Sequence, residues 1–356
     1  MHYSRIANHI FLNRLSHRKL DKLLDRGYFR NANIMFQSQV ICLDGYLDDV
    51  INIRLELDDY KASKSIRKIA RRVESRFSFE IQKVCIDERK EELYQLHQKR
   101  FKGFQFKSLK QMLLGDHPVS VFNTYEVNVY DGDTLIAFSL FDIGQKSIAS
   151  ILGVFDESYK KYSLGLYTMH AEIKWAIEND FEFYYPGYIV KNNSLFDYKL
   201  RMGDYKYFDW TQHSWRTREE IFQLKTVGDT IKNKLQQLAG ALQQINVDYE
   251  YKIYPYYSLG YLSMTNYQFY VKSPYHIYLP QLSSEDRRVL LEYDAEENKY
   301  VLASTKVNES YMEMIMDSNQ QPKESCEHSW NTVLEYLSIH KYPHTERLIR
   351  DIWLNS

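Results

Sequence analysis

The sequence has 356 residues, with 46 lysines and arginines against 47 aspartates and glutamates, so its formal net charge is −1. Hydrophobic residues make up 44% of the chain and aromatic residues 15%, among them 31 tyrosines. This composition excludes a mainly disordered protein. The balanced charge argues against a protein coated in positive charge, although it is compatible with a local basic patch. The length favours two or three domains that each bury a core.

The N-terminal residues and the cysteines favour a soluble protein of a reducing compartment. Residues 1–21 lack the basic region and the following apolar region of a signal peptide. No apolar run approaches the ~20 residues that a membrane-spanning helix needs. Cys42, Cys85 and Cys326 are odd in number and far apart, so they predict neither a disulfide framework nor a metal site. We expect a cytoplasmic protein with no membrane segment and no cofactor.

The N-terminal residues 1–85 predict an α/β domain. Three leucines at helical spacing near residue 20 predict a short helix, and residues 50–57 alternate as a half-buried strand would. Residues 61–76 predict a basic helix that Ser63 or Ser65 could cap. Its apolar stripe would consist of Ile66, Ile69, Ala70 and Val73. Two further helices are expected over 87–102 and 108–114.

Residues 86–215 predict a second domain built on a sheet. In chain order its elements are strands over 119–130, 134–142 and 147–155, a helix over 163–179 and an aromatic strand over 181–185. Asp131-Gly132-Asp133 between the first two strands is a strong hairpin signal. Three antiparallel strands, a helix and a returning strand fit the acyltransferase core of GNAT type. In that core the N-terminus of the helix lies beside a split between two strands.

Residues 216–356 predict an additional C-terminal α+β region of unknown role. A long amphipathic helix is expected over 217–245. Ten tyrosines follow between residues 249 and 278 and fit half-buried strands whose hydroxyl groups reach water. A polar loop near 317–325 and a final helix over 327–340 complete the chain. The predicted fold is therefore α/β (α+β), with a GNAT-like core between an N-terminal α/β domain and this extension.

The basic helix is the first candidate for function. It has seven basic residues and one acid, a local charge of +6: Lys61, Lys64, Arg67, Lys68, Arg71, Arg72 and Arg76, with Glu74. Most such runs are solvated helix faces. Nothing within this segment offsets the charge, however, and cations at this density favour contacts with nucleic-acid phosphates.

The second candidate is the start of the helix predicted over 163–179. Ser163-Leu164-Gly165-Leu166-Tyr167 follows a strand, with Lys160 and Lys161 just before it. Free amide groups at a helix N-terminus bind phosphate, and Gly165 permits a ligand to approach the backbone closely. The same pattern also begins many ordinary helices, so both interpretations stay open.

The third candidate is an aromatic stretch. Residues 183–188 read Phe-Tyr-Tyr-Pro-Gly-Tyr, and residues 196–199 read Phe-Asp-Tyr-Lys. These side chains form either part of the core or the wall of a pocket that stacks a base or an amino-acid side chain, with Lys199 beside it.

Taken in order, these motifs resemble the C-terminal domain of arginyl-tRNA–protein transferases, including their bacterial leucyl-transferring relatives. The family pattern is approximately S-L-G-x-Y, a helix, Y-x-Y-x-G-Y and later Y-K, and residues 163–167, 184–188 and 198–199 are similar to it. Residues 26–30 resemble the family's early Gly-aromatic-Arg element. Residues 63–72 are similar to its Ser-Arg-Ser-x-Arg-Arg helix.

The resemblance implies transfer of an arginyl or leucyl group from charged tRNA to the N-terminal amine of a protein, which is N-degron tagging. Asp or Glu is the expected acceptor residue. The reaction is ester aminolysis, and an α-amino group with a pKa of about 7.7–8.0 needs no strong base. The enzyme must instead position the reactants and stabilise the developing oxyanion.

The resemblance also implies residue roles. The expected catalytic residues are Tyr185, Asp197 and Lys199. The expected substrate-binding residues are Ser163, Leu164, Gly165, Tyr167, Gly187, Tyr188 and Tyr198, and the expected tRNA-binding residues are Lys64, Arg67, Lys68, Arg71 and Arg72.

The sequence also departs from the family. Where the family usually has a cysteine cluster, residues 40–46 contain only Cys42, so we predict no metal or iron–sulfur cluster and no redox control through one. Residues 201–204 after Lys199 lack the usual basic-aromatic ending. Two alternatives stay open: an acyl-CoA-dependent N-acyltransferase, and a non-catalytic binding module that keeps the fold. The oligomeric state is also open.

Overall fold

The structure is a computed structural model and describes residues 5–43, 46–99, 106–115, 117–191, 193–223, 225–262, 269–308 and 328–354. Contacts within the chain divide it into two units. The core unit consists of Ile10–Gln37 and Val50–Gln223. The tyrosine unit consists of Met1–His9, Ser38–Asp49 and Leu224–Ser356. The domain boundaries expected after residues 85 and 215 remain predictions.

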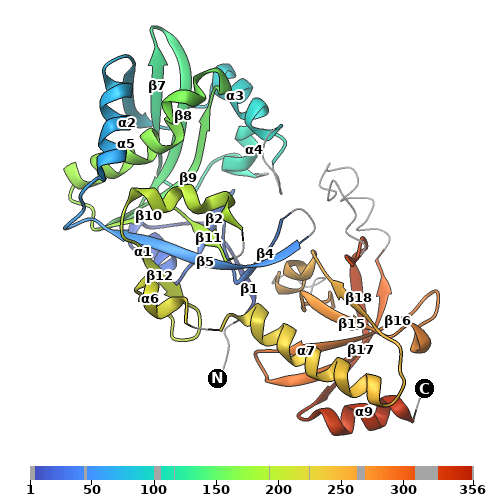
Figure 1. The fold of residues 1–356 in the computed structure, drawn as a ribbon. Helices are drawn as coiled ribbons and strands as arrows, with labels where there is room; N and C mark the ends of the chain where they lie inside the picture. Colours follow the sequence, from blue (N-terminus) through green and yellow to red (C-terminus); the bar gives the residue numbers. More distant parts are fainter. Residues whose placement is uncertain are drawn as a thin grey trace. The chain divides into compact units, whose positions relative to one another are not determined.

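A mixed sheet runs through the core unit (Figure 1). Its first four strands are antiparallel neighbours: β6 (Ser78–Lys83), β7 (Thr124–Asp131), β8 (Thr134–Ile143) and β9 (Ser147–Phe155). β10 (Phe183–Tyr185) then pairs with β9 in parallel. Beyond β10 the order continues through β5 (Tyr46–Glu56), β12 (Lys206–Asp209) and β13 (Ser214–Arg216), and β11 (Tyr188–Val190) also pairs with β5. The three strands and the hairpin predicted between residues 119 and 155 are confirmed.

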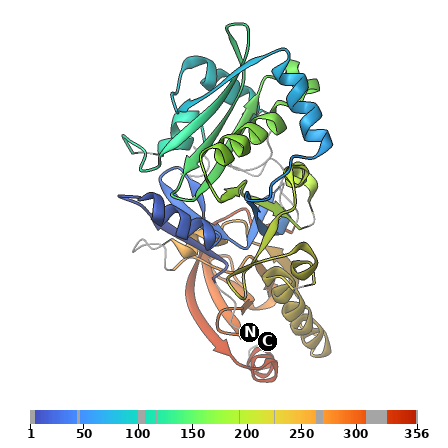
Figure 2. The same cartoon turned by 90° about the vertical axis from the view of Figure 1, so that its left-hand side faces the viewer.

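Helices cover both faces of this sheet. α5 (Leu164–Glu178) and α2 (Lys64–Glu74) lie side by side on one face, and α3 (Glu88–Gln98) and α4 (Leu109–Leu114) lie on the other (Figures 1 and 2). The remaining N-terminal elements are α1 (His17–Asp25), β1 (Ala7–Phe11), β2 (Phe29–Asn31) and β3 (Ile34–Ser38). The mixed α/β class is therefore confirmed. No helix within the described residues is long and apolar enough to cross a membrane.

The strands separate where the GNAT-type order predicts a split. β10 pairs with β9 only at Ser147–Ala149, whereas β9 continues to Phe155 along β8. From Ser150 onward the second edge of β9 has no strand partner among the described residues. Gly187, in the left-handed region at φ +95°, turns the chain towards β11. The short helix η1 (Glu157–Tyr162) then leads from the end of β9 to the N-terminus of α5.

The tyrosine unit is built on a second, five-stranded antiparallel sheet. Its strands in spatial order are β14 (Glu250–Ile253), β15 (Tyr275–Tyr278), β16 (Arg288–Asp294), β17 (Lys299–Val307) and β18 (Leu334–Tyr342). α7 (Val227–Gln244) and α9 (Thr345–Trp353) pack against it. The short helices η3 (Tyr257–Tyr261) and η4 (Pro280–Leu282) also belong to this unit. The hairpin of β4 (Val40–Leu43) with the first residues of β5 adds Val40 and Leu47 to the core of this unit.

Two helices predicted in the C-terminal region differ from the structure. The helix expected over 217–245 is divided into α6 (Arg218–Ile221) and α7, because Thr217 and Thr226 each form a capping box and so begin a new helix. The final helix expected over 327–340 is wrong, because Leu334–Tyr342 forms β18 and pairs with β17 along its length. The loop predicted at 317–325, and Cys326, lie outside the described residues.

The expectation that the C-terminal tyrosines point their hydroxyl groups to water is wrong for three that lie in the core. Tyr254, Tyr257 and Tyr275 are 0%, 4% and 6% exposed. The Tyr254 hydroxyl accepts a hydrogen bond from the Leu334 amide at 3.0 Å. Tyr257 donates to the Val40 carbonyl at 2.5 Å, and Tyr275 donates to the Leu47 carbonyl at 3.1 Å. These tyrosines therefore stabilise the unit by packing in its core and by forming hydrogen bonds with its backbone.

Candidate functional site

Helix α5 begins at the mouth of the split with free backbone donors. Ser163 is its N-cap residue but adopts the left-handed conformation, φ 60° and ψ 46°, and its side chain makes no capping hydrogen bond. The Ser163 carbonyl instead accepts from the amides of Leu166 and Tyr167. The amides of Leu164 and Gly165 have no acceptor among the described residues. These two donors and the helix dipole are available to an anionic or carbonyl oxygen.

Two side chains of the S-L-G-x-Y motif are buried in the core. Leu164 and Tyr167 are 0% and 1% exposed, so any substrate contact at these positions must come from the backbone. A Cβ on Gly165 would approach only the Phe155 ring, at 3.9 Å. The space that a side chain at position 165 would occupy is therefore empty, and a ligand could occupy it.

The basic helix α2 packs beside this start of α5. Its N-cap is Ser63, and its buried residues are those of the predicted stripe, so the helix prediction is confirmed. The cations are exposed, namely Lys64, Arg67, Lys68, Arg71 and Arg72. Arg72, Arg76 and Lys161 lie around the Tyr162 ring, 5.6, 5.5 and 5.2 Å from its centroid.

This arrangement joins two sequence signals that lie far apart in the chain. No ion pair neutralises the five α2 cations among the described residues. The exposed cationic face of α2 and the donors of α5 thus form one positively charged region, which can hold a phosphate backbone.

Lys199 occupies an aromatic cradle at the other side of the split. It lies on η2 (Ser194–Met202), and its Nζ donates to the Tyr188 carbonyl at 3.1 Å. The same Nζ lies 4.9 Å from the Phe196 ring centroid and 5.5 Å from that of Tyr188. A Cβ on Gly187 would come within 3.3 Å of it. Gly187, Tyr188 and Lys199 are thus brought together.

The ammonium group of Lys199 is poorly compensated. No carboxylate forms an ion pair with it in the part of the chain that the structure describes. Desolvation by its surroundings lowers the pKa of Lys199 to about 7. Such a group can bind a carboxylate or a phosphate oxygen, or exchange a proton near neutral pH.

Three other predicted residues lie apart from this cradle. Tyr185 is 3% exposed and belongs to an apolar cluster with Leu20, and its ring packs edge-on against Trp215 at 5.6 Å. Asp197 and Tyr198 are exposed on η2. The catalytic role expected of Tyr185 and Asp197 remains a proposal.

The structure adds one pair of residues that the sequence reasoning missed. Glu172 of α5 is 0% exposed, and its Oε2 accepts a hydrogen bond from the Tyr184 hydroxyl at 2.8 Å. Its Oε1 has no hydrogen-bond partner. Burial raises the pKa of Glu172 to about 7. The available signal was a carboxylate within an otherwise apolar helix, between Ala171 and Ile173.

Arg30 of the Gly-aromatic-Arg element has a structural role. Its guanidinium forms a buried ion pair with Asp142 at 2.8 Å. It also donates to the Thr124 and Ser120 hydroxyls and to the Leu113 and Ala32 carbonyls. One side chain thereby ties the segment around Leu113 to β7 and β8.

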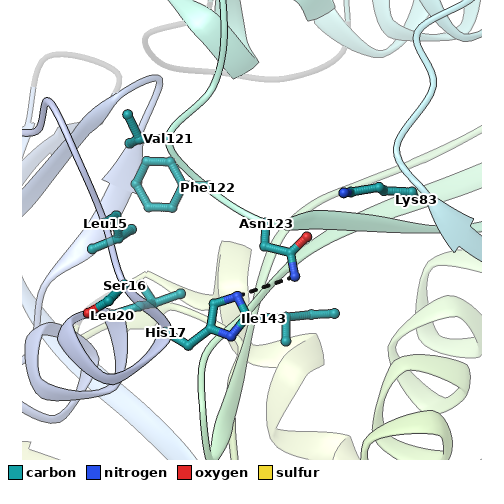
Figure 3. A pocket seen from close by; sticks show the side chains of 9 residues that line it. All are labelled: Leu15, Ser16, His17, Leu20, Lys83, Val121, Phe122, Asn123 and Ile143. Atoms are coloured by element: carbon teal, nitrogen blue, oxygen red, sulfur yellow. Dashed lines mark hydrogen bonds between the residues drawn. The ribbon is translucent and has the colours of Figure 1, made fainter.

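A hollow in the core unit lies elsewhere (Figure 3). Its volume is about 180 Å³, and its polar lining includes His17, Lys83 and Asn123, with the His17 Nε2 and Asn123 Nδ2 atoms 3.4 Å apart. None of the predicted site residues lines it. Among the described residues, no group of three or more His, Cys, Asp or Glu side chains is placed to hold a metal ion.

Comparison with known proteins gives a match over the part of the chain that contains the split. Residues 83–209 match the family model described as "Arginine-tRNA-protein transferase, C terminus". An aspartate/glutamate leucyltransferase of Leptospira interrogans is 25% identical over 202 residues, which span 55% of this chain and 76% of the relative. The enzyme of the same name from Helicobacter hepaticus is 27% identical over 187 residues, 50% of this chain and 74% of the relative.

Among solved structures, L-PGS from Bacillus licheniformis aligns with a TM-score of 0.30 and 14% identity over 41% of this chain and 48% of that one. FemX aligns with a TM-score of 0.31 and 8% identity over 51% of this chain and 64% of that one. TM-scores of this size support no assignment of fold or function.

The match over 83–209 identifies an aminoacyltransferase. Through this region, the chain is similar to the C-terminal domain of arginyl-tRNA–protein transferases and to leucyl-transferring bacterial enzymes.

Proposed function

We propose that this protein transfers an aminoacyl group from charged tRNA to the N-terminal amine of a protein. The observation that carries this proposal is the family match, because residues 83–209 contain β9, the start of α5, β10 and the Lys199 cradle. The relatives are named aspartate/glutamate leucyltransferases, which favours leucine as the transferred residue and Asp or Glu at the acceptor N-terminus. We further propose that it works in the cytoplasm, where charged tRNA is found.

The chemistry requires three things that the site residues can supply. The cations of α2 would hold the phosphates of the acceptor stem. The free amides of Leu164 and Gly165 would bind the terminal ribose or phosphate, or the oxyanion that develops as the ester is attacked. The open edge of β9 would align the acceptor peptide, since unpaired strand groups bind extended chains.

A transfer assay separates the candidate functions. The protein is incubated with leucyl-tRNA, arginyl-tRNA or acetyl-CoA and with peptides that begin with Asp, Glu, Arg or Lys. We expect transfer from leucyl-tRNA to the Asp and Glu peptides, measured by the mass of the product. Transfer from acetyl-CoA alone would support the acyl-CoA-dependent alternative, and transfer from no donor would support the binding module.

Lys199 is the residue that we propose binds the carboxylate of an acceptor Asp or Glu side chain. Its ammonium has no carboxylate among the described residues. A Cβ at position 187 would stand only 3.3 Å from Nζ, so Gly187 keeps a side chain away from the ammonium. A guest carboxylate would give the desolvated ammonium the partner it lacks. Because its pKa is lowered to about 7, this binding should weaken as the pH rises through that value.

Replacing Lys199 with glutamine is expected to lower kcat/KM for Asp-starting peptides by about 10- to 100-fold, the value of a charge-assisted hydrogen bond. Asn-starting peptides, which lack the charge, should be affected much less. Arg201→Gln removes an exposed cation from the same segment and serves as the control. An equal loss for Asp and Asn peptides would contradict the assignment.

A further inference from the structure

Glu172 lies on the face of α5 that is turned towards the split. Gly165, Thr168 and Glu172 follow one another along this face at helical spacing. The Thr168 hydroxyl donates to the Gly165 carbonyl at 3.2 Å, and a Cβ on Gly153 of β9 would meet that hydroxyl at 3.9 Å. The row therefore runs along the unpaired part of β9, from the free amides of α5 inward to Glu172.

Glu172 marks the inner end of the split. Its partner Tyr184 lies on β10 opposite Ile148, within the short stretch where β9 and β10 still pair. The hydroxyl groups of Ser139 and Ser150 face the same carboxyl group, and Ser150 is the first residue of β9 beyond the pairing. The Glu172 carboxylate also raises the pKa of Tyr198, which is 47% exposed on η2.

The carboxyl group is poorly suited to a purely structural position. Oε1 accepts no hydrogen bond of good geometry, although the nearby Ser139 and Ser150 hydroxyls favour the ionised form of the carboxyl group. An ionisable group buried without full hydrogen bonding destabilises a fold. Glutamine has the same shape and no charge, so it would fill this position at a lower cost. Packing therefore does not explain why a carboxylate, with one oxygen that accepts no hydrogen bond, lies where β9 and β10 separate.

We propose that Glu172 accepts the proton that the acceptor's α-ammonium must lose before it attacks the aminoacyl ester, and that Tyr184 positions the Glu172 carboxylate. This inference rests on the proposed function and assigns a proton acceptor to the same site.

The steps balance as follows. The ammonium gives one proton to Glu172 and becomes a neutral amine. Its nitrogen lone pair then forms a bond to the ester carbonyl carbon, and the bond from that carbon to the ribose oxygen of the tRNA breaks. The second proton leaves the nitrogen for that ribose oxygen, which departs as a hydroxyl group. Glu172 returns its proton to solvent before the next turnover.

The surroundings of Glu172 determine the pH dependence. Tyr184 on β10 and Tyr198 on η2 are its titratable neighbours, while β8 and β9 present Ser139 and Ser150. On the same side of the sheet, β7 presents Tyr125, which packs against Trp175. The Glu74 carboxylate of α2 favours higher pKa values for Tyr167 and His170 of α5. With a pKa raised to about 7, Glu172 is ionised and able to accept a proton only above that value. Transfer should therefore fall as the pH drops through it.

The test measures single-turnover transfer from charged tRNA to an Asp-starting peptide over about pH 6 to 9, a range that brackets the α-amino group. Glu172→Gln is expected to lower the rate constant by about 100- to 10,000-fold. Its acidic limb should move from about pH 7 to the pKa of the α-amino group, about 7.7–8.0, because only an amine that is already neutral can then attack. Glu172→Asp should restore part of the rate. Glu178→Gln changes an exposed carboxylate at the end of the same helix and should leave rate and profile unchanged.

Two further measurements distinguish a chemical role from a structural one. Glu172→Gln should unfold at the same or a higher temperature at pH 8, because the folded state no longer buries a carboxylate there. Tyr184→Phe removes the hydrogen bond that favours the ionised form, so it should move the acidic limb to higher pH.

Retention of rate and pH profile by Glu172→Gln, with wild-type transfer intact, would overturn this inference alone. So would an unshifted limb in Tyr184→Phe. A wild-type protein that transfers from no charged tRNA would overturn the proposed function, and this inference with it.

Discussion

Replacing Arg30 with alanine should destabilise the core unit by about 3–5 kcal/mol, the usual effect of breaking a buried ion pair. The substitution leaves Asp142, which is 1% exposed, without its cation. It also leaves the Leu113 carbonyl and the Ser120 hydroxyl without their donor. Urea unfolding measures the loss. Arg26 is an exposed arginine shortly before Arg30 in the chain. As a control, Arg26→Ala should change the free energy of unfolding by less than about 0.5 kcal/mol.

The pH dependence of this loss tests its cause. Burial raises the pKa of Asp142, and the Arg30 guanidinium opposes that shift. Without Arg30 the buried carboxylate is destabilising when ionised and tolerable when protonated, so the loss should shrink as the pH falls. Exchanging both partners, Arg30→Met with Asp142→Leu, should recover much of the stability. A loss that does not vary with pH would show that the neutral hydrogen bonds dominate.

Removal of four cations from α2 should have the largest effect on binding. The change is Arg67, Lys68, Arg71 and Arg72 to alanine. Each lost phosphate contact reduces the slope of log affinity against log salt by about 0.9, so tRNA affinity should fall by about 10- to 1000-fold at physiological salt. Filter binding over a range of salt concentrations measures both quantities.

The fold should survive this change. The four side chains are exposed, the buried stripe of α2 is untouched, and alanine favours helices. Arg347→Ala with Arg350→Ala removes exposed cations from α9 and is the control, for which the slope should stay unchanged. An unaltered salt slope in the α2 variant would remove tRNA binding from this helix.

Local periodicity made parts of the fold predictable. The four residues expected to form the stripe of α2 are its four buried residues, because an amphipathic helix places its apolar side chains at fixed intervals. β9 has the predicted bounds, since turn residues flank it on both sides. β18 was mistaken for a helix because its pairing partner β17 lies far away in sequence and no local pattern identifies it.

The candidate site was only partly predictable for the same reason. The motif around Gly165 and the residues Gly187, Tyr188 and Lys199 were visible as short patterns. Glu172 was missed, because a single carboxylate in an apolar helix is recognisable as unusual only when its free oxygen and Tyr184 are seen together. The roles proposed for the site residues remain predictions that the experiments above test.

The tyrosine unit has a consequence for the order of events during synthesis. Val40 and Leu47 of the β4–β5 hairpin belong to the same core as Ile231 and Leu235 of α7, and the Asp49 carboxylate accepts a hydrogen bond from the Gly228 amide at 3.1 Å. This hairpin leaves the ribosome early and cannot bury its apolar side chains until residues beyond 224 have followed. The intervening segment, Val50–Gln223, can meanwhile complete its own sheet. Once Gln223 has left the ribosomal exit tunnel, a paused nascent chain should therefore carry a folded core unit and a protease-sensitive hairpin. Chaperones that bind exposed apolar strands would have access to this state.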